Sequence, residues 1–86
     1  MRRDAPKQAF AAREAHEALL ELKKLVDEVT KTTHTAELES FYVAIHHGHR
    51  GEVQRTLQDV VELLESPKFE AVLSRAREKL EYAVSV

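Results

Sequence analysis

Cysteine is absent from this 86-residue sequence. The chain can therefore form no disulfide, bind no metal through thiolates and use no cysteine nucleophile. The absence fits a cytoplasmic protein, and we predict that location. The basic start Met1-Arg2-Arg3 is not followed by an apolar run, so we expect no signal peptide.

Long apolar runs are also missing. The uninterrupted ones extend over only a few residues, so the sequence predicts no transmembrane helix and no membrane partner. Aromatic residues make up only 6% of the chain, so the core is expected to consist of Leu, Val and Ala. With 43% hydrophobic and 33% charged residues, the composition is that of a folded domain. The length predicts one domain, residues 1–86.

The chain carries no excess charge of either sign. Its formal net charge is -2, and Lys and Arg are mixed with Asp and Glu, which argues against a nucleic-acid partner. Phosphate-cradling glycine loops, serine nucleophile elbows and the inward Glu-x-x-His pattern of di-iron bundles are absent. A small domain filled with Leu and Val has little room for a substrate pocket. We therefore predict a protein that is not an enzyme and has no cofactor.

Glycine and proline number two each, and their positions divide the chain. Gly48 and Gly51 predict a tight turn, and Ser66-Pro67 predicts the start of a new helix. The segment 30–35, TKTTHT, predicts a further break, because β-branched and hydroxyl side chains disfavour helix. We therefore predict an all-α fold, a compact bundle of four helices at 6–31, 36–47, 52–65 and 67–84.

Two alternatives accompany this assignment. The segment 40–45, SFYVAI, has strand-forming residues, but its apolar spacing is helical and no second strand is present to pair with it. The joint at Ser66-Pro67 is very short. The last two helices are therefore expected to meet at a sharp angle, and a single helix kinked at Pro67 is the alternative.

The first predicted helix is much longer than the next two. At 1.5 Å per residue it extends about 40 Å. The shorter helices can cover its apolar stripe by stacking end to end along it. Otherwise part of the stripe contacts a second copy of the chain, through a series with near-heptad spacing: Ala12, Ala15, Leu19, Leu22, Val26 and Val29.

Several large apolar residues lie off the predicted inward stripes. Because their helices have other residues to bury, these side chains are candidates for contact with another protein. The sequence therefore predicts a helical protein–protein interaction or oligomerisation module, with a partner protein or a second copy as its ligand. A small regulator that masks a site on a larger protein is an alternative. The predicted interaction residues are Phe10, Leu20, Val43 and Tyr82.

The segment His46-His47-Gly48-His49-Arg50 is the one unusual cluster. Imidazole is a common ligand for zinc, nickel and copper. A metal-binding bundle that uses His46, His47 and His49 is therefore a further alternative function, with Glu52 or His34 as added ligands. Adjacent histidines on a helix point about 100° apart, so we expect exposed histidines at a helix end to be the more ordinary explanation.

Overall fold

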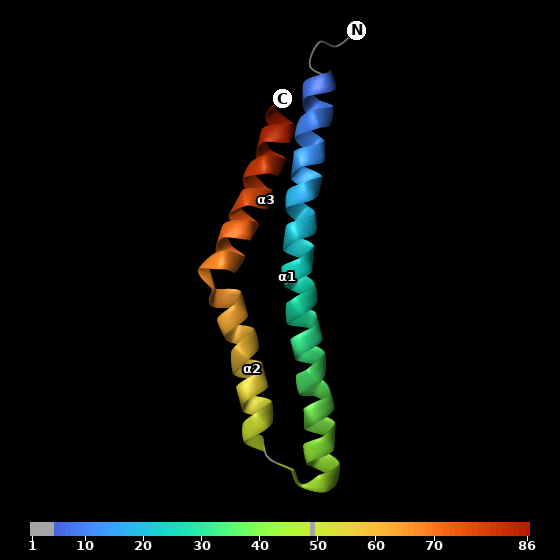
Figure 1. Ribbon diagram of the computed structural model, residues 1–86, viewed down its shortest axis with the longest axis vertical. Helices are drawn as coiled ribbons and strands as arrows, with labels where there is room; N and C mark the ends of the chain where they lie inside the picture. Colours follow the sequence, from blue (N-terminus) through green and yellow to red (C-terminus); the bar gives the residue numbers. More distant parts are fainter. Residues whose placement is uncertain (1–4, 49) are drawn as a thin grey trace.

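The computed structural model describes residues 5–48 and 50–86, and these residues form three helices. They are α1 (Ala5–His46), α2 (Arg50–Glu65) and α3 (Pro67–Ser85). α2 and α3 lie end to end along one side of α1 and run antiparallel to it, so that the chain forms a long helical hairpin (Figure 1). The all-α class is confirmed. The prediction of four helices in a compact bundle is wrong, because the helices predicted at 6–31 and 36–47 are one.

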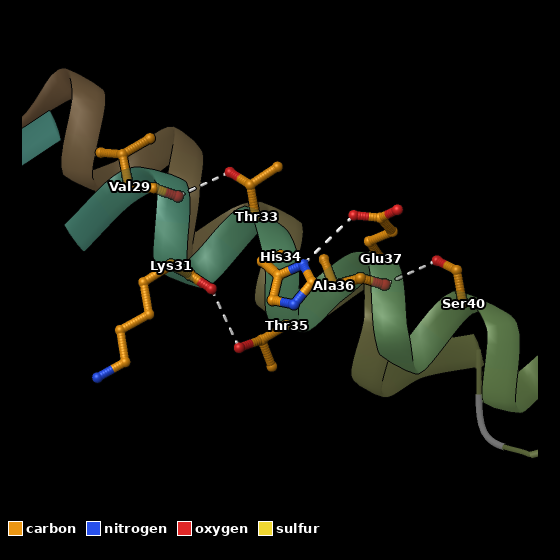
Figure 2. A network of polar contacts seen from close by, with 8 residues as sticks. All are labelled: Val29, Lys31, Thr33, His34, Thr35, Ala36, Glu37 and Ser40. Atoms are coloured by element: carbon orange, nitrogen blue, oxygen red, sulfur yellow. Dashed lines mark hydrogen bonds and ion pairs between the residues drawn. The ribbon is translucent and has the colours of Figure 1, made fainter. Parts of the chain in front are cut away.

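α1 continues through the threonine-rich segment 30–35. The hydroxyl of Thr33 donates to the carbonyl of Val29 at 2.7 Å, and that of Thr35 donates to the carbonyl of Lys31 at 3.2 Å (Figure 2). The other two threonines of the segment also donate to the carbonyl four residues back. The hydroxyls are therefore satisfied inside the helix and do not draw the backbone into a turn.

The remaining cost of the threonines is too small to end the helix. β-branched residues disfavour helix by only about 0.7 kcal/mol each relative to Ala. The stretch 7–47 contains neither glycine nor proline, the two residues that break helices strongly. Ala36 on the far side of the threonines is buried against α2, and this tertiary contact favours a continuous helix.

The turn after α1 differs from the expected one in its backbone. His47, and not Gly48, has the left-handed conformation, with φ of 54°. At position 48 a Cβ atom would lie 3.2 Å from Cδ1 of Tyr42, so a larger residue there would require a small shift of this exposed ring. Gly51 already belongs to α2, and apart from its chain neighbours and the backbone of its own helix, no described atom lies within 4 Å of the place where its Cβ would be.

α2 and α3 are separate helices joined at Ser66, as predicted. They lie end to end along α1, so the sharp angle expected between them is wrong (Figure 1). Ser66 has an extended backbone (φ -66°, ψ 143°), and its hydroxyl accepts a hydrogen bond from the Phe69 N–H at 3.2 Å. Pro67 occupies the first turn, where no N–H is needed. The same hydroxyl donates to the carbonyl of Leu63 at 2.8 Å, so that one side chain joins the end of α2 to the start of α3.

Ser66→Ala is expected to lower the free energy of unfolding by about 1 kcal/mol, because the Phe69 N–H loses its acceptor. Ser66→Asp keeps an acceptor at the cap and should retain most of the stability. Urea unfolding followed by circular dichroism measures both variants. Equal stability of Ser66→Ala and the wild type would contradict the assigned cap.

The hairpin is a single layer of helices. Its extents are 68 × 22 × 13 Å, and 13 Å is about the diameter of one helix with its side chains. The radius of gyration is 19.2 Å, against about 12 Å for a compact domain of this length. The chain is therefore extended, and the expected compactness is corrected for this reason as well.

A layer one helix thick cannot enclose large side chains. Among the described residues, the buried ones are all alanines, because only a side chain this small is covered completely between two helices: Ala11, Ala15, Ala18, Ala36 and Ala76. Larger apolar residues on the same seam, such as Leu22 and Leu25, are half-buried. Of the Leu, Val and Ala expected in the core, only alanines are fully buried among the described residues.

Candidate functional site

The inward row of α1 follows a heptad spacing. Its members are four and three residues apart in alternation, and apart from Glu14 they are the residues of α1 that are not exposed: Ala11, Ala15, Ala18, Leu22, Leu25, Val29, Thr32, Ala36, Glu39 and Val43. This spacing keeps one seam turned toward the antiparallel partner over the whole length of a helix. The residues on either side of the row then point to the two broad faces of the layer.

One of these faces is apolar. Near the Ala5 end, Ala12 and Leu19 of α1 line one open hollow together with Leu80 and Val84 of α3. Near the turn, Leu57 of α2 lines a hollow with Ser40 and Ala44, which are on the same side of α1 as Leu19.

Residues seven apart in a helix lie above one another, so the surface continues to Val26 on α1 and along α2 and α3. Beyond Val26, the positions of α1 on this face are Thr33 and Ser40. The large apolar side chains on this surface are all exposed. We call the following eight side chains the apolar face: Leu19, Val26, Leu57, Val61, Leu64, Leu73, Leu80 and Val84.

The opposite broad face carries charge. Lys79 Nζ lies 3.1 Å from Glu14 Oε2, and Arg75 Nη1 lies 3.9 Å from Glu21 Oε2, so that two ion pairs join α3 to α1 on this side. We call this the charged face. Near the turn, the Thr56 hydroxyl donates to Glu39 Oε1 at 2.7 Å within the seam. The two faces therefore differ in chemistry, and the polar contacts between helices leave the apolar face free of charge pairs.

Two of the predicted interaction residues come together. Phe10 and Tyr82 line one open hollow on the charged face near the Ala5 end, with Glu14 and Lys79 beside them. Both aromatic side chains are exposed.

The other two predicted interaction residues lie elsewhere. Leu20 is exposed and points away from α2 and α3, because it is directly opposite the inward row on the helix. Val43 belongs to the inward row and is half-buried against α2. The four residues thus do not form one surface, and their role in binding stays a prediction.

The apolar side chains near the turn face outward. In the predicted helix 36–47, the helical apolar spacing would turn Leu38, Phe41, Tyr42 and Ile45 inward, but all four are exposed. Ala36 and Val43 face α2 instead. The inversion follows from the continuity of α1, since the heptad row set by its first half determines which side of its second half faces inward.

The histidines near the turn do not converge in the described part of the chain. His46 is exposed and packs against Tyr42, with ring centroids 4.5 Å apart. His34, proposed as an added ligand, lies 3.4 Å from the carboxylate of Glu37 (Figure 2). Over residues 5–48 and 50–86, no three His, Asp or Glu side chains are grouped for a metal ion. The prediction for His49 lies outside the described residues.

Comparisons with protein families, curated proteins and solved structures find no match to this chain. In the part of the chain that the structure describes, no helix is long and apolar enough to cross a membrane. Among the same residues, no polar or charged side chain is buried.

Helical periodicity alone did not predict the apolar face, because it does not divide a wide apolar stripe between two surfaces. In α3, for example, Val72 and Leu73 both fall within one apolar stripe at helical spacing. The structure divides them: Val72 is turned to the seam and Leu73 to the apolar face. The sequence feature that indicates the apolar face is the width of the apolar stripes, which is greater than one neighbouring helix can cover.

Proposed function

We propose that the protein is a non-enzymatic helical module that self-associates, with two copies packed together through their apolar faces. The observation that carries this proposal is the row of eight exposed, large apolar side chains on one face of a single helical layer. Contiguous apolar surface of this kind is typical of sites that bind another protein. Stable helical domains generally have two packed layers, and a second copy would supply the missing layer.

The exposed area supports the proposal. The chain has a mass of 9.8 kDa and exposes 7142 Å². A compact monomer of this mass exposes about 5,200 Å², which leaves an excess of about 2,000 Å². One partner in a standard interface loses about 800 Å² on binding. The excess is therefore large enough for a stable dimer interface.

The shape of the apolar face favours a second copy over a different partner. The layer measures 68 × 22 Å, so an occupant that covers the face must be equally long, flat and apolar on one side. Another copy of the chain has these dimensions and this chemistry. A two-fold axis would place the same surface on both sides of the interface, which is the commonest arrangement of homodimers.

Adjacent leucines on α1 provide the test. Leu19 is 37% exposed and belongs to the apolar face, whereas Leu20 is 45% exposed and points away from the hairpin. Leu19→Glu should weaken self-association at least about tenfold, since each copy would bury an unpaired carboxylate. Leu20→Glu should leave self-association unchanged. Sedimentation equilibrium of the wild type and both variants measures the dissociation constants.

The outcomes separate the two predicted surfaces. The wild type should have twice the 9.8 kDa chain mass at micromolar concentration. Loss of the dimer in Leu20→Glu alone would support the surface predicted from sequence and contradict the apolar face. A wild type that stays monomeric at every accessible concentration would rule out self-association.

A further inference from the structure

We propose that the two copies lie parallel, related by a two-fold axis along the length of the layer. In this arrangement α1 of each copy covers α2 and α3 of the other. The inference rests on the self-association proposed above and adds its orientation. The alternative is an antiparallel pair, whose two-fold axis crosses the layer at its middle and places α1 over α1.

Two charged residues border the apolar face at nearly the same height, by which we mean the position along the long axis of the layer. Lys23 lies on α1 four residues after Leu19, and Glu70 lies on α3 three residues before Leu73. Both are exposed, and by helical spacing both are on the outer edges of the apolar face. Since α1 and α3 are on opposite sides of the layer, Lys23 and Glu70 of one copy are separated by its full width.

The ion pairs of the charged face determine these heights. Arg75 pairs with Glu21, and Lys79 pairs with Glu14. Because the two helices run antiparallel, Glu70 is then level with residues 23 to 26 of α1. Lys23 and Glu70 therefore differ in height by at most about 5 Å, at 1.5 Å per residue.

A parallel pair makes these charges complementary. Its two-fold axis exchanges the sides of the layer and keeps the height, so that Lys23 of each copy faces Glu70 of the other, twice in the dimer. In an antiparallel pair, α1 of one copy lies over α1 of the other. The two helices run in opposite directions and cross at the middle of α1, near residues 25 and 26. The antiparallel pair brings Lys23 close to the second Lys23 and Glu70 close to the second Glu70. Like charges at an interface disfavour that arrangement.

The apolar residues do not by themselves decide between the two arrangements. By the same heights, Leu19 lies between the levels of Leu80 and Leu73. A parallel pair therefore places Leu19 of one copy against these two leucines of the other. An antiparallel pair places Leu19 against the segment 30–33 of the second α1, where the hydroxyls of Thr30 and Thr33 are exposed. On the α2 side the comparison is reversed: a parallel pair places Leu64 and Leu57 against Thr33 and Ser40 of the other copy, whereas an antiparallel pair places them near Leu73 and Leu80. The orientation is therefore inferred from the charges.

Disulfide cross-linking tests the orientation, because the chain has no cysteine of its own. Lys23→Cys and Glu70→Cys are made in separate chains, and the two variants are mixed and oxidised. A parallel pair should give a disulfide-linked dimer that contains one chain of each kind, while each variant alone should give none. Lys68→Cys, on the other side of α3, is the matched control and should not link to position 23.

The outcomes distinguish this inference from the proposed function. Linked dimers in each variant alone would show an antiparallel pair, which overturns the orientation and leaves self-association standing. A dimer in solution with no linkage in any mixture would also overturn it. A chain that stays monomeric in sedimentation would overturn the self-association itself.

Discussion

Thr33→Pro is expected to lower the free energy of unfolding by about 3 kcal/mol or more. Position 33 lies well inside the 42-residue α1. Proline there removes a backbone N–H from the helix, and its ring clashes with the preceding turn. α1 is the helix along which both α2 and α3 pack, so a kink at this point would separate it from them. Urea unfolding followed by far-UV circular dichroism measures the loss.

Thr33→Ala is the matched control for this prediction. It removes the same hydroxyl bond to Val29 but substitutes the best helix former, so its stability should stay within about 1 kcal/mol of the wild type. Similar stabilities of the proline and alanine variants would mean that the backbone is not helical at position 33. That result would support the break that the sequence predicted at 30–35.

Ala76→Leu should be the second strongly destabilising change, at about 1–3 kcal/mol. Ala76 is 2% exposed and faces α1 across the seam, where the buried residues of α1 are also alanines. A leucine has no space at this point. It would force α3 away from α1 and disturb the nearby pair between Lys79 and Glu14. Thermal unfolding with the same chain concentration in each sample measures the effect.

Ala71→Leu provides the comparison, because Ala71 is on the same helix but is exposed. The same substitution there should change stability by less than about 0.5 kcal/mol. Equal effects at positions 71 and 76 would show that α3 does not pack closely on α1. A large effect at position 76 alone would support a seam whose spacing depends on small side chains.

The sequence predicted the second half of the fold well, for local reasons. Ser66 and Pro67 have strong positional preferences at the start of a helix, and the glycines near residue 48 mark the turn. The predicted helices 52–65 and 67–84 therefore agree with α2 and α3 within two residues. The break at 30–35 was wrong because propensity cannot show that four threonine hydroxyls would bond within the helix.

The candidate site was harder to predict, because it depends on how many neighbouring helices cover each helix. Periodicity shows which residues share one side of a helix, but it does not show how many neighbours will cover that side. Leu73 and Val72 look equivalent in the sequence, and they differ because α1 is the helix that packs along α3 in the described part of the chain, with α2 touching only its start. Phe10 and Tyr82 could be recognised as off-stripe residues, but their proximity depends on the antiparallel packing of α3 against α1.

The two ends of the hairpin differ, and this difference matters for assembly. The start of α1 and the end of α3 lie together at one extremity, where Gln8 Nε2 donates to the Ala83 carbonyl at 3.4 Å. Leu38, Phe41 and Ile45 are exposed near the other extremity. A parallel dimer would thus be a rod with unlike poles: anything fused to either terminus would project from one pole, and the opposite pole would display two sets of these hydrophobic side chains. An antiparallel dimer would have identical poles, so tags on the two chains would stand a full rod length apart.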